Sequence, residues 1–311
     1  MDDWLFIGPT TLAGIGQVTK RYSRLVPNGE YVEFGQVPKK TRYGRGFAFV
    51  LPVAQQLDLV DQYAGMCSSM IYMTICETET VNPAYGMLVD RYKTLWVASE
   101  FCKGVLEKQF PEGRWRVLHL WADVPTTVPR HNLVTTPYIF YTIGNVADPR
   151  KNINALIRAL GSFPDARLLI KATCNQPIQC EHPQVTIING LLSDEQMENV
   201  HAKGHCYVNC SHSEGVGMGA VEAALRNKPV IITEYGGLKE YVRTPWVVKC
   251  ELGPIGFDDF LFTKDLVWGH PSYDDLVRHM AACYEQRVVS WDHSHTAGLV
   301  TAVPDALASS Q

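Results

Sequence analysis

The chain has 311 residues, of which 46% are hydrophobic and 19% are charged, and its formal net charge at pH 7 is −4. This composition is typical of a globular protein of about two domains, and the slightly acidic balance excludes a globally basic nucleic-acid binder. No apolar run approaches the ~20 residues of a membrane helix, and the first residues do not form a signal peptide, so we expect a cytoplasmic protein.

The first part of the chain alternates short β-branched or aromatic runs with stretches of helix length. We predict strands over six of these runs, residues 4–8, 31–34, 47–51, 70–76, 95–98 and 116–120. Helices are expected in most of the gaps, and Ser99 is placed to cap one that carries Val105 and Leu106. Strands that alternate with helices in this way predict βαβ units on a parallel sheet.

A second set of runs follows a stretch of different composition. Residues 124–137 hold three prolines and four threonines with almost no apolar periodicity, which is typical of a linker. After it we predict strands over residues 138–144, 167–171, 185–188, 206–209, 229–233 and 246–249. Ser193 and Gln196 form the pattern of a capping box, and an amphipathic helix is expected after Ser272.

These patterns predict the domain organisation of the chain. A first domain is expected over residues 1–125, a linker over 126–137 and a second domain over 138–290. The remaining residues, 291–311, form a tail that can pack back on the first domain. Nine cysteines are scattered through the chain without a Cys-x-x-Cys pair, which fits neither a disulfide framework nor a zinc ribbon. We therefore expect reduced thiols.

Two glycine-rich loops follow predicted strands. In the first loop, Gly14 and Gly16 come after the strand at 4–8, where backbone N–H groups and a helix N-terminus can hold a phosphate. A tight turn is the alternative, because Thr19 stands where a dinucleotide-binding fingerprint has its third glycine. This loop alone therefore does not identify a nucleotide site.

The second loop contains two carboxylates that bracket the start of a predicted helix. Glu214 follows the strand at 206–209, and Glu222 lies one to two turns into the helix. Doubly wound folds bind ligands at the C-terminal edge of the sheet, which is where Glu214 falls. Three glycines let backbone amides approach an anion closely: Gly215, Gly217 and Gly219. A pair of solvated surface glutamates is the alternative.

The sequence around these carboxylates resembles that of a known family. Glu214-Gly-Val-Gly-Met-Gly-Ala-Val-Glu222, followed by Asn227-Lys-Pro-Val-Ile, is similar to the Glu-x7-Glu signature of the retaining glycosyltransferases of family 4. Residues 141–152 resemble the strand and basic loop that open the C-terminal domain of that family, and the similarity extends over about residues 4–250. The resemblance implies the α/β GT-B architecture, in which two Rossmann-like doubly wound domains face each other across a cleft.

The resemblance also implies roles for the matching residues. Glu222 would bind the ribose hydroxyls of a nucleotide, and Glu214, with amides near Gly217 and Met218, would hold the transferred sugar. Lys151 would meet the diphosphate. The family usually has an arginine where this chain has Asn145, so Arg150 in the following loop is the candidate to replace it. The donor-binding residues expected are Gly14, Gly16, Asn145, Arg150, Gly215, Gly217, Met218, Gly219 and Glu222.

The implied reaction is the retaining transfer of a sugar from a nucleotide-diphosphate-sugar to a hydroxyl acceptor. Fixed cations and helix N-termini would stabilise the leaving diphosphate, since no Asp-x-Asp motif stands at a strand end, so we expect neither a metal nor a cofactor. The alternatives are a nucleotide-sugar epimerase or phosphorylase of similar architecture, and a non-catalytic sugar-nucleotide-binding module.

The acceptor is left open between a glycan or small hydroxyl compound and a hydroxymethylated base in DNA. Glu77 and Glu79, after the strand at 70–76, are candidates to orient an acceptor hydroxyl, with capping of the next helix as the alternative. Residues 18–46 contain seven basic and two acidic residues, a local charge of +5. Such a segment can grip a phosphate backbone, or be a solvated loop or a patch for anionic lipid. The basic residues concerned are Lys39, Lys40, Arg42 and Arg45.

Overall fold

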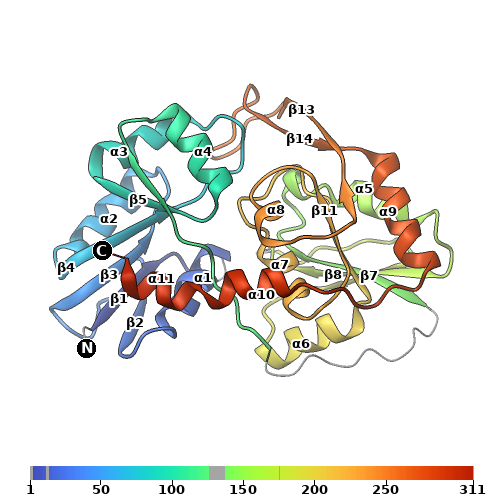
Figure 1. Ribbon diagram of the computed structural model, residues 1–311, viewed down its shortest axis with the longest axis horizontal. Coiled ribbons are helices and arrows are strands. Elements are labelled where there is room, and N and C mark those ends of the chain that lie inside the picture. The colour runs from blue at the N-terminus through green and yellow to red at the C-terminus, as the bar shows by residue number, and fades with distance from the viewer. Residues whose placement is uncertain (1–2, 12–13, 126–136, 175, 311) are drawn as a thin grey trace. The chain divides into compact units, whose positions relative to one another are not determined.

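The computed structural model describes residues 3–11, 14–125, 137–174 and 176–310, and the chain divides into two compact units (Figure 1). Unit 1 consists of Met1–Asp123, Pro254–Val267 and Leu299–Gln311, and unit 2 consists of Val124–Gly253 and Trp268–Gly298. The linker expected over residues 126–137 lies outside the described residues except for its last position. Within the described ranges, no helix is both long and apolar enough to cross a membrane.

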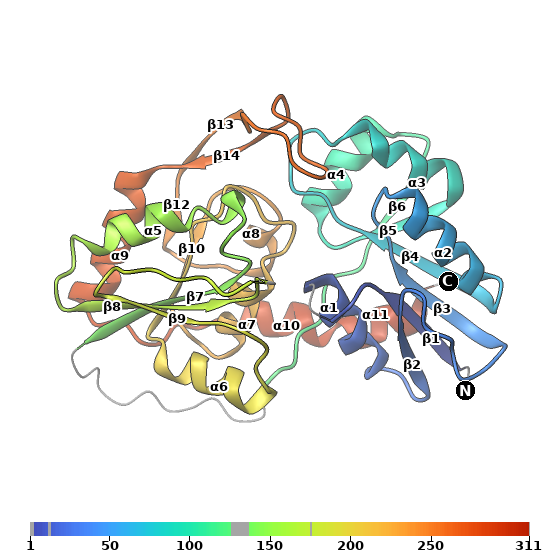
Figure 2. The same ribbon diagram turned by 180° about the vertical axis from the view of Figure 1, so that it is seen from behind.

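Unit 1 is built on a parallel sheet of six strands in the order β2-β1-β3-β4-β5-β6 (Figure 2). Its strands are β1 (Trp4–Gly8), β2 (Gly29–Glu33), β3 (Tyr43–Phe49), β4 (Cys67–Thr74), β5 (Thr94–Val97) and β6 (Arg114–Val117). Its helices include α1 (Gly14–Ser23), α2 (Ala54–Ala64), α3 (Gly86–Arg91), α4 (Glu100–Gln109) and α11 (Val303–Ser309), with a 3-10 turn η1 at Pro83–Tyr85.

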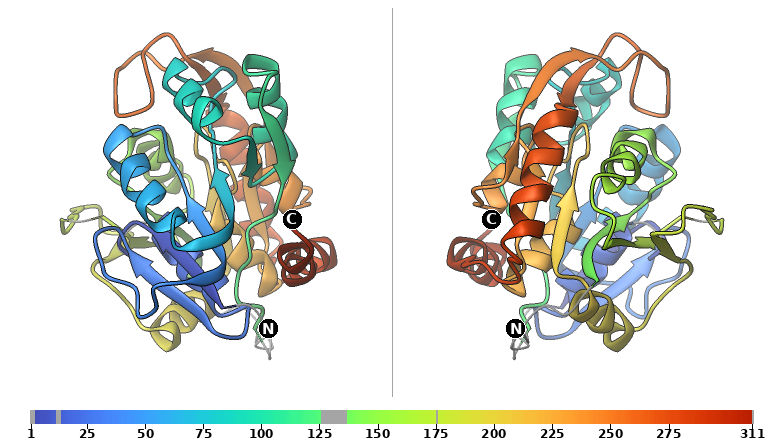
Figure 3. Two further views of the ribbon diagram at one scale, coloured as in Figure 1. Left: turned by 90° about the vertical axis from the view of Figure 1, so that its left-hand side faces the viewer. Right: turned by 90° about the vertical axis from the view of Figure 1, so that its right-hand side faces the viewer.

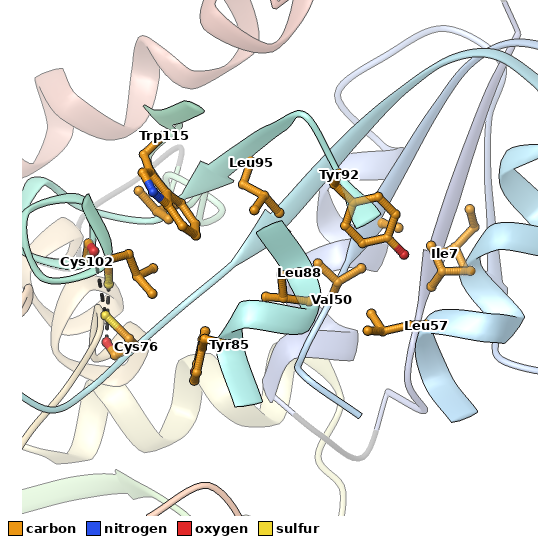
Figure 4. Close-up of a cluster of buried hydrophobic side chains, with 14 of the residues drawn as sticks. Ile7, Val50, Leu57, Cys76, Tyr85, Leu88, Tyr92, Leu95, Cys102 and Trp115 are labelled. Atoms are coloured by element: carbon orange, nitrogen blue, oxygen red, sulfur yellow. Dashed lines mark hydrogen bonds between the residues drawn. The ribbon is translucent and has the colours of Figure 1, made fainter. Parts of the chain in front are cut away.

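The alternation of side chains along β1 places apolar groups on both faces of this sheet. Leu5 and Ile7 join a buried cluster with side chains from α2, α3 and α4 (Figure 4). Phe6 packs instead against Phe47, with ring centroids 5.6 Å apart, and Phe47 stacks on Tyr22 of α1 at 5.0 Å. Helices therefore cover both faces of the sheet.

Cys76 and Cys102 lie beside each other in the buried cluster of unit 1 (Figure 4). The Cys102 thiol donates a hydrogen bond to the carbonyl oxygen of Cys76 over 3.2 Å, and the Cys76 thiol donates to the carbonyl oxygen of Cys102 over 3.7 Å. All nine cysteines are free in the structure.

Unit 2 contains a second parallel sheet of six strands, in the order β12-β11-β10-β7-β8-β9. Its strands are β7 (Tyr138–Gly144), β8 (Ala166–Ala172), β9 (Val185–Ile188), β10 (Cys206–Asn209), β11 (Val230–Thr233) and β12 (Val247–Val248). Its helices are α5 (Ile153–Leu160), α6 (Asp194–Lys203), α7 (Met218–Leu225), α8 (Leu238–Tyr241) and α9 (Tyr273–Glu285), with a 3-10 turn η2 at Pro149–Lys151. Starting from β9, this is the 3-2-1-4-5-6 order of the Rossmann fold.

The helices of unit 2 lie on both faces of its sheet. Helices α5 and α9 pack together on one face, and α6 lies on the other (Figures 1 and 3). Leu276 and Met280 of α9 share a buried cluster with Tyr138 and Phe140 of β7. Two further strands, β13 (Cys250–Pro254) and β14 (Val267–Pro271), form a small sheet, and α10 spans Ser294–Thr301.

All twelve predicted strands are present, and the predicted pair of doubly wound α/β sheets is confirmed. Ser99 caps α4 by accepting a hydrogen bond from the Cys102 N–H at 3.2 Å, and Ser193 and Gln196 form the predicted capping box of α6. The strand expected over 70–76 begins earlier, at Cys67, because exposed serines at its start gave no apolar signal. Strands β13 and β14 were not predicted, since each contains a glycine and a proline, which count against a strand.

Candidate active site

The strand order of unit 2 reverses between β7 and β10, and both strands end at the same edge of the sheet. They pair in parallel, with Tyr207 opposite Tyr141. At such a switch point the loops after the two strands diverge, which leaves room for a ligand. A small pocket lies there, lined by Thr142, Ile143, Gly144, Val146, Lys151, Ile153, Asn209, Cys210, Ser211 and Glu214.

Glu214 is the buried acid of this pocket, with 5% of its surface exposed. Its Oε1 accepts three hydrogen bonds, from Lys151 Nζ at 2.6 Å, Ser211 Oγ at 2.8 Å and Asn209 Nδ2 at 3.1 Å. Its Oε2 lies 3.4 Å from Nη1 of Arg150. Burial raises the pKa of Glu214, but the charges of Lys151 and Arg150 outweigh burial and lower this pKa to about 2. Glu214 is therefore ionised at neutral pH.

Arg150 has a partner for each nitrogen of its guanidinium. Its Nε and Nη2 donate to Oδ2 of Asp148 at 3.2 and 3.1 Å, and its Nη1 donates to the carbonyl oxygen of Ser213 at 3.1 Å. The carboxylate of Asp148 also caps η2 by accepting from the backbone N–H of Arg150 at 2.9 Å. These contacts hold Arg150 against the protein, whereas Lys151 at the pocket wall forms an ion pair with Glu214.

Two contacts fasten the loop that carries the cations to the loop that carries Glu214. Asn152 adopts a left-handed conformation with φ of 52° and donates from Nδ2 to the carbonyl oxygen of Cys210 at 3.2 Å. The backbone N–H of His212 donates to the carbonyl oxygen of Arg150 at 2.8 Å. The distance between Lys151 and Glu214 is therefore set by main-chain contacts as well as by their own ion pair.

The main chain of Glu214 is held by the glycine turn after β11. Gly237 donates its N–H to the carbonyl oxygen of Glu214 at 2.8 Å. Gly236 has φ of +92°, and a Cβ at this position would lie 2.5 Å from the same oxygen. Only glycine fits this turn, because a side chain would be strained and would push Glu214 away.

The start of α7 also depends on glycines. Gly217 caps this helix in a left-handed conformation with φ of +75°, and Met218 is the first helical residue. A Cβ on Gly219 would lie 2.3 Å from the hydroxyl oxygen of Tyr207, so glycine allows α7 to approach β10. Gly215 is buried in the preceding loop. Backbone conformation thus accounts for Gly217, and close packing for Gly219, without a ligand.

Glu222 is not among the residues that line the pocket of Glu214. It lies in α7 with 13% of its side chain exposed, and its Oε2 is 3.9 Å from Nε2 of His201 on α6. Its backbone carbonyl oxygen accepts a hydrogen bond from Arg226 at 2.7 Å. The two signature carboxylates therefore have separate surroundings within unit 2.

Asn145, which stands where the family has an arginine, is exposed at the end of β7. Its Oδ1 accepts a hydrogen bond from the thiol of Cys174 at 3.1 Å. Gly144 before it lines the pocket. An amide in this place supplies no positive charge, whereas the loop after it brings the cations Arg150 and Lys151 beside Glu214.

The first glycine-rich loop lies in unit 1. Gly14 is exposed, whereas Gly16 is buried, and a Cβ on Gly16 would lie 2.3 Å from the carbonyl oxygen of Thr10. The N–H of Thr11 donates to Oε1 of Glu33 at 3.1 Å. Close backbone packing therefore explains one of the two glycines, and a role of this loop in donor binding stays a prediction.

Glu77 and Glu79 also lie in unit 1, where both are half-buried after β4. The N–H of Glu79 donates to the carbonyl oxygen of Val267 at 2.8 Å, so this stretch is fastened to the segment Pro254–Val267 of the same unit. Their role toward an acceptor stays a prediction.

The four basic residues predicted to contact an acceptor all lie in unit 1 and fall into two groups. Lys39 and Arg42 are exposed. Lys40 forms an ion pair with Asp3 at 2.6 Å. The guanidinium of Arg45 lies over the indole ring of Trp4 in β1, 5.2 Å from the ring centroid. The side chains of Lys39 and Arg42 are available to a ligand anion, whereas those of Lys40, which is also exposed, and Arg45 have contacts within unit 1.

Four residues beside the two signature carboxylates were not predicted: Asp148, Asn209, Ser211 and His201. Asn209 and Ser211 sit directly after β10, a position that could have drawn attention to them. His201 carries no such signal, since its neighbour Glu222 is 21 positions away in the sequence. Among the described residues, no three His, Cys, Asp or Glu side chains come together as a metal site.

Comparison with known proteins adds a family and a fold. The family described as glycosyl transferases group 1 matches residues 123–245, which make up most of unit 2. No curated protein matches the chain by sequence.

Three solved structures illustrate the similarity in fold. Sucrose-phosphate synthase from Thermosynechococcus elongatus has a TM-score of 0.60 and 13% identity, over 86% of this chain and 72% of the synthase. The pneumococcal O-GlcNAc transferase GtfA, solved with UDP and GlcNAc, has a TM-score of 0.58 and 13% identity, over 85% of this chain but 56% of GtfA. The lipopolysaccharide outer core galactosyltransferase WaaB has a TM-score of 0.57 and 13% identity, over 98% of this chain and 96% of WaaB. At such identities the likeness establishes the fold.

Proposed function

Because residues 123–245 match the family of group 1 glycosyl transferases, we propose that the chain is a retaining glycosyltransferase and that the pocket around Glu214 binds its nucleotide-sugar donor. The sugar then passes to a hydroxyl acceptor with retention of its anomeric configuration. The observation that carries this proposal is the ion pair of the half-buried Lys151 and the buried Glu214, 2.6 Å apart at the switch point of the sheet. A cation and an anion held there match the two ends of a sugar–phosphate bond.

In the proposed complex, each part of the donor has its own partner. The diphosphate contacts the ammonium of Lys151, and Glu214 accepts hydrogen bonds from hydroxyls of the sugar. The N–H groups of Gly217 and Met218 open α7, so the helix N-terminus adds partial positive charge. Glu222 binds the ribose hydroxyls. Arg150 is a positioning residue, because its guanidinium is already shared among Asp148, Ser213 and Glu214.

The proposed transfer relies on these fixed charges and not on a metal ion. Negative charge grows on the diphosphate as the bond to the sugar breaks, and a preorganised ammonium stabilises that charge without reorganising. The new bond forms on the face that the phosphate leaves, and the departing phosphate oxygen accepts the proton of the acceptor hydroxyl. No protein nucleophile is then required.

The products of a mixed panel of nucleotide-diphosphate-sugars and hydroxyl acceptors test this function. Mass spectrometry should find an acceptor that is heavier by one sugar, together with free nucleoside diphosphate. Turnover of the donor without transfer would support an epimerase or phosphorylase instead. If no nucleotide shifts the melting temperature of the protein, a non-catalytic sugar-binding or scaffold module is the better description.

Two acceptor classes are proposed, a glycan or other small hydroxyl compound and a hydroxymethylated base in DNA. The exposed cations Lys39 and Arg42 favour the second class, because they lie in a turn-rich segment where they can contact phosphates. The neighbouring aromatic residues Tyr43 and Phe47 are buried, so they offer no surface for base stacking. A base in a duplex has to be flipped out of the stack to reach a transferase pocket. The two classes make different predictions for the dependence of acceptor binding on salt.

If DNA is the acceptor, replacing Lys39 and Arg42 with glutamine should weaken binding of hydroxymethylated DNA. The slope of log affinity against log salt should fall by about one for each lost phosphate contact, while donor binding stays unchanged. Fluorescence anisotropy over a salt series measures this slope. The matched control replaces Lys93 and Lys108, two exposed cations elsewhere in unit 1. An unchanged slope, or no transfer to hydroxymethylated DNA, would reject DNA as the acceptor and favour a glycan or other small hydroxyl compound.

A further inference from the structure

His201 is the buried side chain beside Glu222 that the proposed function does not use. It lies near the end of α6 and is 1% exposed, and its Nε2 has no hydrogen-bond partner. Nε2 is 3.9 Å from Oε2 of Glu222, which is too far for a hydrogen bond but close enough for attraction between a ring N–H and a carboxylate. A buried donor without a partner is costly and calls for an explanation.

The other ring nitrogen of His201 contacts Tyr141 on β7. Nδ1 lies 3.1 Å from the Tyr141 hydroxyl oxygen, and the two rings are perpendicular at 5.6 Å. Burial raises the pKa of Tyr141 far above its usual range, so its hydroxyl keeps a proton to donate to Nδ1. Burial also lowers the pKa of His201, so the ring is neutral and has one proton. We assign that proton to Nε2, because the carboxylate is on that side.

Arg226 ties α7, which carries Glu222, to α6, which carries His201. Its guanidinium donates to both carboxylate oxygens of Glu198 on α6, from Nε at 2.9 Å and from Nη2. Its Nη1 donates to the backbone carbonyl oxygen of Glu222 at 2.7 Å. The separation of His201 and Glu222 is thus fixed by this bridge, which holds Nε2 beside the Glu222 carboxylate.

We propose that His201 is a positioning residue for donor binding, whose Nε2–H, directed by Tyr141, restrains the Glu222 carboxylate in the orientation that accepts both ribose hydroxyls. This inference rests on the proposed function, because it needs Glu222 to bind ribose. A restrained carboxylate loses less rotational freedom when the nucleotide binds, so affinity is higher than with a free one.

The experiment compares nucleoside diphosphates with and without the ribose hydroxyls. UDP, GDP and ADP, each with its 2′,3′-dideoxy counterpart, are titrated by calorimetry against the wild type, Glu222→Ala, His201→Phe and His201→Gln. The wild type should prefer the ribose form of its nucleotide. His201→Phe should weaken the ribose form about 10-fold and leave the dideoxy form unchanged, because only the ribose form uses Glu222. His201→Gln should recover most of that loss, since its amide can donate toward the same carboxylate.

The outcomes separate this inference from the proposed function. Equal weakening of both nucleotide forms by His201→Phe means that His201 only supports the fold, and the inference is overturned. A selective loss in Glu222→Ala without one in His201→Phe also overturns it, while leaving the ribose role of Glu222 intact. If Glu222→Ala shows no selective loss of the ribose form, Glu222 does not bind the ribose hydroxyls. If His201→Phe does not fold, Tyr141→Phe takes its place, and it should show a smaller selective loss of the ribose form.

Discussion

Replacing Glu214 with glutamine should lower the turnover number of sugar transfer by about 10²- to 10³-fold and change the affinity for nucleoside diphosphate little. The pKa of Glu214 is about 2, so the substitution removes a full negative charge at neutral pH. Positive charge develops on the sugar in the transition state as its bond to phosphate breaks. An anion beside the sugar therefore stabilises the transition state more than the ground state.

Steady-state kinetics with varied donor concentration measure this effect, and Glu222→Ala provides the contrast. That variant should raise the KM for the donor more than it lowers kcat, because ribose is bound alike in the ground state and the transition state. Glu195→Gln is the matched control, since Glu195 is an exposed residue in the first turn of α6 in the same unit. Wild-type kinetics in both Glu214→Gln and Glu222→Ala would show that neither carboxylate takes part in donor binding or transfer.

The fold was predictable because strand patterns are local. The run at Trp4–Gly8 is fully buried, and the β-branched or aromatic runs of both sheets gave the same kind of signal. The same pattern did not predict strand β13, because its five residues include Gly253 and Pro254 and bury their side chains only in part. Its pairing with β14 depends on a partner 13 or more residues away, which periodicity cannot detect.

The pocket was predictable only in part. The signature around Glu214 and the basic loop pointed to two chain segments, and the strand order explains why Lys151 and Glu214 meet. The ion pairs and hydrogen bonds of Arg150 and Lys151 could not be predicted from the sequence, because they depend on side-chain geometry. Asp148 reaches Arg150 across one residue of a turn, which makes that arginine a neighbour of Glu214 with its donors already engaged. No spacing rule distinguishes such an arginine from one that is open to a diphosphate.

Replacing Lys151 with methionine should cost about 2 to 4 kcal/mol of transition-state stabilisation, the effect of losing one preorganised donor to a developing charge. Methionine keeps most of the aliphatic length but removes the ammonium, which lies 2.6 Å from Oε1 of Glu214. The ammonium is also among the groups that lower the pKa of Glu214, so this pKa should rise in the variant. The ratio of kcat/KM values for the wild type and the variant gives the free-energy loss directly.

The same prediction has a second arm, because a fixed cation makes a divalent metal unnecessary at the diphosphate. Activity of the wild type should persist after dialysis against EDTA, and added manganese should not restore the Lys151→Met variant. Lys203→Met is the matched control, since Lys203 is an exposed lysine at the end of α6 in the same unit, and its activity should equal that of the wild type. Activity that is lost in EDTA and regained with manganese would show that a metal carries the charge of the leaving group. Lys151 would then serve chiefly to pair with Glu214, and the loss of activity in the methionine variant should be smaller than the ~2 to 4 kcal/mol expected of a donor to the developing charge.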